Sequence, residues 1–430
     1  MLADNITVRG GTLYFAGHSA VQLAQKYGTP LYLMDETRIR ENCRMYLRAF
    51  RKHFGENAMP LYASKAASFK RMYEIMHSEG LGVDVVSAGE IHTAVLAGFP
   101  MERAYFHGNN KTDEEIRYAI EQGVGYFVAD NREELDAISR IAGARGLVQR
   151  VLLRLTPGID PHTYEAVSTG KVDSKFGVAI ETGQAEELFQ YVSALPNVAL
   201  AGFHCHVGSQ VFEEDVFQRA GRIMLEFIAL LRARYGFVTQ QLDLGGGYGV
   251  RYREHDLAVD IEQRIGEVAA SLKTSAAELG IPLPMILMEP GRSIAADAGM
   301  TLYSVGTVKR IPGYKNYVSV DGGMTDNPRF ALYQSAYTVY AANRMEEPVA
   351  LHCDVVGRCC ESGDIIQPNV DLPEVRRGDL LAVCTTGAYN YSMASNYNRV
   401  ARPPVVMLTP EGDSLAVRRE TLEQLTENDV

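Results

Sequence analysis

Short runs of β-branched and aromatic residues alternate with amphipathic stretches between about residue 60 and residue 290. Apolar positions three and four residues apart predict helices in these stretches, for example over 113–121, 133–141 and 260–279. The runs between them predict eight strands, over 61–63, 83–86, 104–107, 126–129, 151–155, 200–207, 242–244 and 285–288. Successive strand–helix units of this number are typical of a closed (β/α)8 barrel, so we expect an α/β fold with this barrel over residues 35–290.

The pattern changes after residue 291. Short strands over 303–309, 317–320, 349–355, 380–384 and 405–408 follow with few helices between them, which predicts an all-β C-terminal domain over residues 291–430. The segments 6–8 and 13–15 have the pattern of a hairpin, and we expect residues 1–34 to supply N-terminal strands that complete this β domain. A further strand, 31–34, has no assigned partner.

The composition is that of an ordinary globular protein, with 46% apolar and 22% charged residues. The 42 Lys and Arg residues against 53 Asp and Glu give a formal charge of −11, which repels nucleic acids and anionic lipid surfaces. No apolar run reaches the ~20 residues of a membrane span, and the first residues lack the basic and apolar regions of a signal peptide. We therefore expect a soluble cytoplasmic protein that binds neither nucleic acid nor membrane.

Chemistry on a (β/α)8 barrel is carried out at the carboxyl ends of the strands, so polar residues at those positions are the first candidates. Lys65 ends the first predicted strand, where a lysine can act as a Schiff-base nucleophile or can simply lie on the surface. His204 and His206 are two residues apart, which places both rings on one face of a strand. Such a pair can bind a metal, or one ring can stack on a flat cofactor while the other is buried and hydrogen-bonded.

Two turns near the end of the barrel segment have the composition of anion-binding loops. The glycine run from Gly245 to Gly249 follows a strand directly, and its backbone N–H groups can close on a phosphate or form a tight turn. It is not a dinucleotide fingerprint, because that pattern requires glycine where this chain has Val250. Glu289-Pro290-Gly291-Arg292 closes the eighth strand and reads either as the other half of a phosphate site or as a structural salt bridge.

Together these pieces, in this order, resemble the fold-type III pyridoxal-phosphate-dependent decarboxylases. The resemblance covers nearly the whole chain and is closest to the members that act on diaminopimelate. It rests on Arg329 with Tyr333 and on these motifs: YASKA from Tyr62, VSAGE from Val86, SKFG from Ser174, HCHVGSQ from His204, GGGYG from Gly245, EPGR from Glu289, DGGM from Asp321, CESGD from Cys360 and GAY from Gly387.

The resemblance implies pyridoxal 5'-phosphate as the cofactor and no metal. Lys65 would carry the cofactor covalently, His206 would stack on its ring, and Glu289 would pair with its protonated ring nitrogen, which prepares the ring to accept electrons. The remaining cofactor-binding residues, most of them around the phosphate, would be Asp84, Ser209, Gly246, Gly291, Arg292 and Tyr389.

The resemblance also implies a reaction and a substrate: loss of carbon dioxide from the D-centre of meso-diaminopimelate, giving L-lysine. Arg292 and Arg329 would bind substrate carboxylate, for which a guanidinium fork is well suited, together with Tyr333 and Tyr389. Glu361 would bind the distal ammonium, and Cys360 would be the acid that delivers a proton. In this family the Cys-Glu pair comes from the neighbouring subunit, which implies a homodimer with shared active sites.

The chain departs from the family pattern in three places. Cys359 stands beside Cys360, so two thiols compete for the acid role, and we choose Cys360 because it immediately precedes Glu361. The loop 162–170 is about two residues longer than we expect, and the segment 398–403 differs from the family's ending.

Three other interpretations remain open. The substrate could be a related compound such as D-ornithine, arginine or a carboxylated polyamine, for which the cofactor motifs would be the same. A metal-dependent barrel hydrolase would use His204 and His206 as ligands with Lys65 as a carbamylated bridge. A non-catalytic binding or regulatory subunit is disfavoured because Lys65, Cys360 and Glu361 are all retained.

Overall fold

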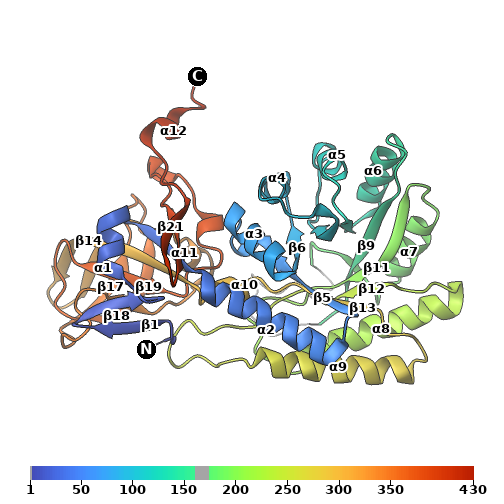
Figure 1. Cartoon of the computed structure of the whole chain (residues 1–430), viewed down its shortest axis with the longest axis horizontal. Helices are drawn as coiled ribbons and strands as arrows, with labels where there is room; N and C mark the ends of the chain where they lie inside the picture. Colours follow the sequence, from blue (N-terminus) through green and yellow to red (C-terminus); the bar gives the residue numbers. More distant parts are fainter. Residues whose placement is uncertain (1, 160–173) are drawn as a thin grey trace. The chain divides into compact units, whose positions relative to one another are not determined.

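The computed structural model describes residues 2–159 and 174–430, so the long loop predicted over 162–170 lies outside the described residues. Contacts divide the chain into two compact units (Figure 1). The barrel unit comprises Asn42–Gly249 and Val259–Gly291, and the β unit comprises Met1–Glu41, Val250–Ala258 and Arg292–Val430. The short segment Val250–Ala258 therefore leaves the barrel sequence to join the β unit.

The barrel unit contains eight parallel strands that close on themselves, which confirms the predicted barrel. In chain order they are β5 (Ala58–Ala63), β6 (Gly82–Val85), β7 (Ala104–Phe106), β8 (Tyr126–Ala129), β9 (Gln149–Thr156), β11 (Val198–His204), β12 (Gln241–Asp243) and β13 (Met285–Met288). Each pairs with the next, and β13 pairs with β5 to close the circle. A two-residue strand, β10 (Val178–Ala179), adds to β9 and was not expected.

Helices follow the strands and surround them; Figure 1 shows α4, α5 and α6 side by side outside the barrel. They are α3 (Lys70–Glu79), α4 (Ala88–Leu96), α5 (Asp113–Glu121), α6 (Arg132–Gly143), α7 (Gln184–Ser193), α8 (Val216–Tyr235) and α9 (Ile261–Glu278), with α2 (Glu36–Phe54) preceding β5. Local sequence sets where they begin: Ser87, Thr112 and Asn131 each accept a backbone N–H of the first helical turn. These caps fix where each helix begins, so the loops that connect the strand ends to the helices are short.

The barrel interior is a packed core. One layer is formed by side chains from six of the strands: Leu61, Tyr105, Val128, Leu152, Ala201 and Leu287. Because inward-facing side chains fill the centre, the strands are rigidly spaced and the residues that follow them are held at one end of the barrel.

The β unit is built on a mixed sheet. Its strands run in the order β18-β17-β15-β14-β4-β20-β21, and β19 pairs with both β14 and β16. Their bounds are β14 (Gly299–Ile311), β15 (Lys315–Val320), β16 (Val339–Ala341), β17 (Leu351–Val356), β18 (Ile365–Leu372), β19 (Leu380–Cys384), β20 (Val405–Thr409) and β21 (Gly412–Val417). Short helices α10 (Arg292–Ala295), α11 (Arg329–Tyr333) and α12 (Leu422–Thr426) interrupt or follow the strands.

The N-terminal segment joins the β unit, but not through the strands that the hairpin pattern indicated. β1 (Ile6–Arg9), β2 (Thr12–Phe15) and β3 (His18–Ser19) form a separate three-stranded sheet, followed by α1 (Ala20–Tyr27). The strand that enters the large sheet is β4 (Leu31–Asp35), the one without an assigned partner, and it pairs with β14 and β20. The hairpin completes the core instead, where Leu13 and Phe15 pack with residues of β4 and β14.

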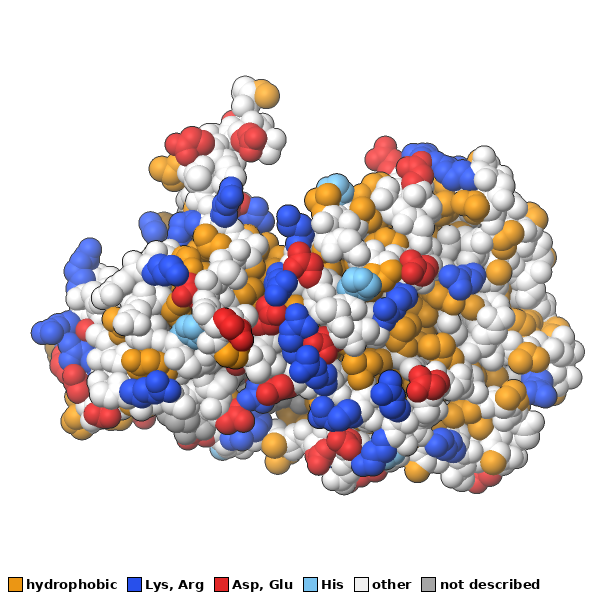
Figure 2. All heavy atoms as spheres, in the orientation of Figure 1, with side chains coloured by type: hydrophobic (Ala, Val, Ile, Leu, Met, Phe, Trp, Pro, Cys, Tyr) orange, Lys and Arg blue, Asp and Glu red, His pale blue; other side chains and the backbone are white. Residues whose placement is uncertain are grey.

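Surface charges of both signs are interspersed on the face drawn in Figure 2. Many of them form exposed ion pairs, such as Arg222 with Glu226 and Lys52 with Glu262. Among the described residues, none of the helices has the length and apolar character needed to cross a membrane.

Candidate active site

One group of predicted site residues lies at the carboxyl ends of the barrel strands. Lys65 follows β5, Asp84 lies in β6, and Gly246 follows β12. The others follow β11 and β13: His206, Ser209, Glu289 and Gly291. Parallel strands of a closed barrel end at the same mouth, so these residues belong to one site of the barrel unit.

Lys65 stands in a single 3-10 turn (Ser64–Ala66) directly after β5. Its two neighbours in the turn, Ser64 and Ala66, are buried, whereas Lys65 is exposed. The turn is pressed against the end of β13: Ala63 donates its backbone N–H to Pro290 O at 3.1 Å. A Cβ on Gly291 would come within 2.9 Å of the Ala63 Cβ, which explains glycine at this position.

The glycine run is packed against two neighbouring strand ends. A Cβ on Gly246 would lie 2.0 Å from the carbonyl oxygen of Glu289, so no larger residue fits there. The Gly246 N–H donates to Nδ1 of His206 at 3.2 Å, which assigns the remaining ring proton to Nε2. Burial, and then the nearby Lys65 ammonium, lower the pKa of His206 well below its ordinary value. The His206 ring is therefore neutral and fixed in orientation.

Glu289 is only 5% exposed and faces two imidazoles. Its Oε1 lies 3.1 Å from Nε2 of His107 and 3.2 Å from Nε2 of His204. Burial lowers the pKa of both rings, so they are neutral near pH 7. Burial alone would raise the pKa of Glu289, but the ring N–H groups of the two facing histidines and the charge of Lys65 outweigh it and hold this pKa well below its ordinary value.

Two further carboxyl groups lie in the same buried cluster. Burial, followed by the charge of Glu289, raises the pKa of Asp84 and of Asp243 well above the ordinary range. Both therefore bind a proton more readily than Glu289, which is the carboxyl group of this cluster that most readily carries the negative charge. A single buried carboxylate of this kind is suited to bind a cationic N–H donor.

His107, His204 and Glu289 each bring one ligand atom within 4.8 Å of the others, an arrangement that could also hold a metal ion. The metal set that the sequence left open was a different one, His204 with His206 and Lys65. β11 ends at His204, so His206 lies beyond the strand, and the two rings have different partners. The alternation rule therefore did not apply to this pair.

The predicted carboxylate-binding residues lie in the β unit and contact one another. Tyr389 is flanked by two guanidinium groups, with its ring centre 4.7 Å from Cζ of Arg292 and 5.0 Å from Cζ of Arg329. Tyr333 lies over the same Arg329, also at 5.0 Å. Tyr389 adopts a left-handed backbone with φ of 68°, which is unusual for a bulky residue and fixes the direction of its ring.

The two arginines are buried, with exposed fractions of 6% for Arg292 and 5% for Arg329. Tyr252, from the segment that leaves the barrel sequence, accepts a 2.6 Å hydrogen bond from Arg292. Among the described residues, Nε of Arg329 has no hydrogen-bond partner. A buried guanidinium donor without a partner is costly unless an anion binds it, so this group is a candidate carboxylate site.

Cys360 and Glu361 are both exposed, on the loop between β17 and β18. The loop is ordered by the buried Asp364, whose carboxylate accepts the backbone N–H groups of Cys359 (2.7 Å) and Met324 (2.6 Å). Burial, with the charge of Asp364, raises the pKa of Cys359 to about 11. Of the two adjacent thiols, Cys360 is thus the exposed one, and Cys359 is the one held against the protein.

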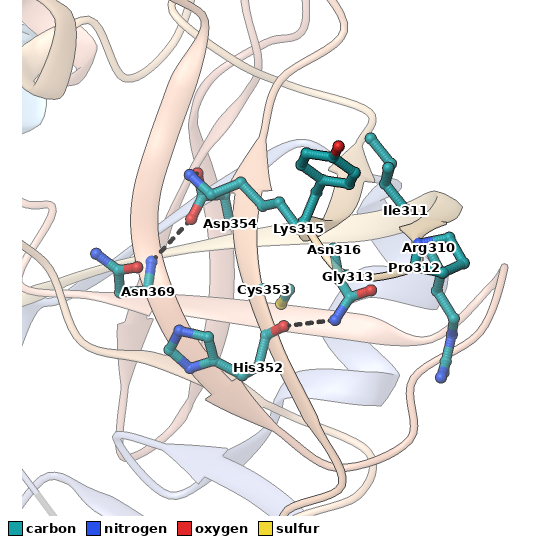
Figure 3. Close-up of a pocket in the computed structure, with 11 residues that line it drawn as sticks. Arg310, Ile311, Pro312, Gly313, Lys315, Asn316, His352, Cys353, Asp354 and Asn369 are labelled. Carbon is teal, nitrogen blue, oxygen red and sulfur yellow. Dashed lines mark hydrogen bonds and ion pairs between the residues drawn. The ribbon is translucent and has the colours of Figure 1, made fainter.

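A separate hollow of about 560 Å³ lies at the end of the β14–β15 hairpin (Figure 3). Its charged groups are paired within the protein: Asp354 accepts from Lys315 at 2.6 Å and from the backbone of Asn369 at 3.0 Å. It contains none of the residues that the sequence predicted for a site.

Three residues of these clusters were not predicted from the sequence. His107 ends the predicted strand 104–107, so the rule that singled out Lys65 would have found it. Asp243 lay inside the predicted strand 242–244 and ends β12 only in the structure. Tyr252 carried no such signal because it lies in a loop.

Comparison with known proteins places these features in a family. Residues 37–296 match the pyridoxal-dependent decarboxylases, pyridoxal binding domain. The chain is 45% identical to diaminopimelate decarboxylase from Bacillus subtilis, over 98% of this chain and 95% of the relative, and 44% identical to that from Staphylococcus aureus, over 98% of both. Its fold matches the crystal structure of diaminopimelate decarboxylase from M. jannaschii in co-complex with L-lysine, with a TM-score of 0.91, 32% identity and coverage of 99% and 98%.

Proposed function

The chain belongs to the pyridoxal-dependent decarboxylases, and from this premise we propose how its residues divide the work of a diaminopimelate decarboxylase. It removes carbon dioxide from diaminopimelate to give lysine, with pyridoxal phosphate as cofactor. The assignment of residues rests mainly on one observation: the exposed Lys65 and the buried carboxylate of Glu289 lie at the same end of the barrel.

The residues at this mouth fit pyridoxal phosphate. Buried polar atoms without a hydrogen-bond partner among the described residues include Glu289 Oε1 and Asp84 Oδ1, which suits a site built to receive a polar ligand. The glycine run leaves no room for a side chain at Gly246 and so presents bare backbone, as a phosphate requires. We propose that Ser209, Gly246 and the Gly291–Arg292 turn hold the phosphate.

When bound, pyridoxal phosphate supplies an electron sink for the carbon that loses carbon dioxide. Lys65 would hold the cofactor through its side-chain amine. Glu289 would accept the ring N–H and keep that proton in place, and the neutral imidazole of His206 would cover one face of the ring. Burial, and then the charge of Glu289, raise the pKa of Asp84, which disfavours a second negative charge in the site.

We propose that the β unit recognises the substrate's carboxylate through Arg292 and Arg329. The ring of Tyr389 contacts both guanidinium groups, and the ring of Tyr333 contacts that of Arg329. The charges of diaminopimelate favour this substrate, because its retained end carries a carboxylate and an ammonium. D-ornithine, arginine and a carboxylated polyamine are the related compounds against which the selectivity for diaminopimelate is measured.

The proton donor and the ammonium-binding residue are proposed to act between subunits. Cys360 and Glu361 are exposed on an ordered loop, as groups that serve a partner subunit must be. We therefore propose a homodimer in which Cys360 delivers a proton to the substrate carbon and Glu361 binds the distal ammonium.

Borohydride reduction of the cofactor-loaded protein, followed by peptide mapping, tests the assignment of Lys65. We expect the label on Lys65, no label on the Lys65→Ala variant, and normal labelling of Lys70→Ala, which removes an exposed lysine of α3. A label on another lysine would overturn the assignment. Carbon dioxide release from meso-diaminopimelate, D-ornithine, arginine and a carboxylated polyamine then tests the substrate, with diaminopimelate expected to be the preferred one.

A further inference from the structure

Glu289 is held by more than the residues that bind the cofactor. Its Oε1 is approached by Nε2 of His107, 3.1 Å away, and by Nε2 of His204, 3.2 Å away. The two rings meet edge to face, with centres 4.9 Å apart, and both are almost fully buried. Two imidazoles from different strands therefore converge on one carboxylate oxygen.

The charges of this group favour donation from the imidazoles to the carboxylate. Neutral imidazoles can each donate one ring N–H, whereas Glu289 as an anion can only accept. Among the described residues, none of the three facing atoms has a well-directed hydrogen bond. The two rings are close enough to Glu289 to form hydrogen bonds, but the bonds are not well aligned. Such geometry is common in a site that tightens only when its ligand binds.

His107 is also well anchored by the loop that follows it. Its backbone N–H donates to Val85 O at 2.8 Å, which fixes the start of the loop after β7. Lys111 fixes the other end: its buried ammonium donates to Gly108 O at 2.9 Å and to Glu134 at 2.7 Å. Because the loop that begins at His107 is fixed at both ends, the His107 ring cannot easily move away from Glu289. His107 is therefore placed to constrain that carboxylate.

We propose that His107 is a positioning residue for the cofactor, which orients Glu289 toward the ring nitrogen of pyridoxal phosphate. This rests on the proposed function, because it presumes that Glu289 meets that nitrogen. His107 itself need not touch the cofactor or the substrate. Its contribution is to occupy one carboxylate oxygen, shield it from water and leave the carboxylate turned to its ligand.

A cofactor analogue without the ring nitrogen separates this role from a merely structural one. The protein freed of cofactor is titrated with pyridoxal phosphate and with 1-deazapyridoxal phosphate, in wild type, His107→Phe and His107→Gln, and binding is followed by visible absorbance. Loss of one hydrogen bond to a buried charge should weaken pyridoxal phosphate binding to His107→Phe roughly tenfold to a hundredfold. The deaza analogue has no ring nitrogen for Glu289 to meet, so its binding should not depend on the orientation of this carboxylate. Its affinity should change less than about twofold.

The variants include a rescue and a control. Glutamine keeps a donor near the position of Nε2, so His107→Gln should recover most of the lost affinity. His92→Phe removes an exposed histidine of α4 that contacts Tyr118, and it should leave both affinities unchanged. The ratio of the two affinities within one variant is independent of any fraction that fails to fold.

Each outcome decides between the proposals. Equal weakening of both ligands in His107→Phe, or no weakening of either, would overturn the positioning role. If wild type itself binds pyridoxal phosphate no better than the deaza analogue, the assignment of Glu289 to the ring nitrogen fails, and the proposed function fails with it if neither ligand binds.

Discussion

At the scale of single residues, Asp84, Asp243 and Glu289 show how neighbours decide charge. All three carboxyl groups are buried, which by itself raises each pKa. Only Glu289 faces two imidazoles, and only its pKa is lowered overall. Within the cluster, the negative charge is therefore favoured at Glu289, the side chain that is proposed to meet the ring nitrogen, and disfavoured at the other two.

The same scale limits what could be predicted from the sequence. Position after a strand singled out Lys65 and Glu289, because the side chain that follows a barrel strand faces the mouth. His107 satisfies that rule too, but a lone histidine has no distinctive spacing and was passed over. Tyr252 could not be predicted, since nothing in its local sequence indicates that it reaches Arg292.

Glu361→Gln should reduce diaminopimelate turnover far more than cofactor binding. The carboxylate is proposed to meet the distal ammonium of the substrate, so glutamine keeps the shape but removes the charge that faces the cation. Breaking such a pair typically costs roughly 30-fold or more in kcat/KM. Steady-state kinetics measure the loss, and visible absorbance should report cofactor content near that of wild type.

Glu411→Gln is the matched control for this variant, because Glu411 is exposed in the turn between β20 and β21. It should leave both readings unchanged. A Glu361→Gln enzyme that loses its cofactor but has undiminished kcat/KM once cofactor is restored would move Glu361 to the cofactor site.

At the scale of elements, the barrel strands were predictable and several strands of the β unit were not. Barrel strands are buried on both faces and appear as short apolar runs between capped helices. β4 has the same character, but its partners β14 and β20 lie more than 250 residues further along the chain, so its place in the sheet could not be derived from local pattern. β16, β18 and β21 are short or partly exposed and gave no clear run.

Asp326, whose carboxyl group is buried, connects β14 and β4 to the turn that precedes α11. Tyr303 of β14 donates to its Oδ1, and the Gly323 N–H donates to its Oδ2 at 3.0 Å. Tyr32 of β4 donates to the Asp326 carbonyl oxygen at 2.5 Å. The turn that precedes α11, and with it Arg329, is thereby tied to the centre of the sheet.

This connection should make the stability of the protein depend on pH. Burial raises the pKa of Asp326 to about 7, whereas in the unfolded chain the group has its ordinary value. Between these two values the folded state keeps a proton that the unfolded state has lost, so stability falls as pH rises, by about 4 kcal/mol in all. Stabilisation is complete below about pH 4 and has been lost above about pH 7.

Asp326→Asn, which resembles the protonated acid, should remove this pH dependence. Urea unfolding at pH 5 and at pH 8 measures it: relative to wild type, the variant should gain stability between the first pH and the second. Asp429→Asn, at an exposed site near the C-terminus, should show no such change. A difference between Asp326→Asn and wild type that is the same at both pH values would contradict the assignment.

At the scale of the whole molecule, the placement of Cys360 and Glu361 has a consequence for assembly. Both side chains are exposed, although the chemistry proposed for them requires a desolvated site. A partner subunit that covers them would supply that environment, and the ordered backbone around Asp364 would present them in a fixed geometry. Neither the charge pattern nor the strand pattern of the sequence could reveal this, because assembly depends on surfaces that only the folded chain creates.

Two inactive variants should therefore restore activity to each other. In a mixed dimer of Lys65→Ala and Cys360→Ala, one site combines an intact Lys65 with an intact Cys360 from the other subunit, while the other site lacks both. A two-fold symmetric dimer has two equivalent sites. If about half of the dimers are mixed after random exchange, and one of the two sites in each is intact, roughly a quarter of full activity should return.

Mixing Lys65→Ala with Glu289→Ala is the matched control: both changes lie in the barrel unit, so no site in that mixture is intact and no activity should return. Carbon dioxide release is assayed after exchange of differently tagged subunits has been demonstrated by co-purification. If the first mixture exchanges subunits and still stays inactive, each chain must use its own Cys360, and the shared site is wrong.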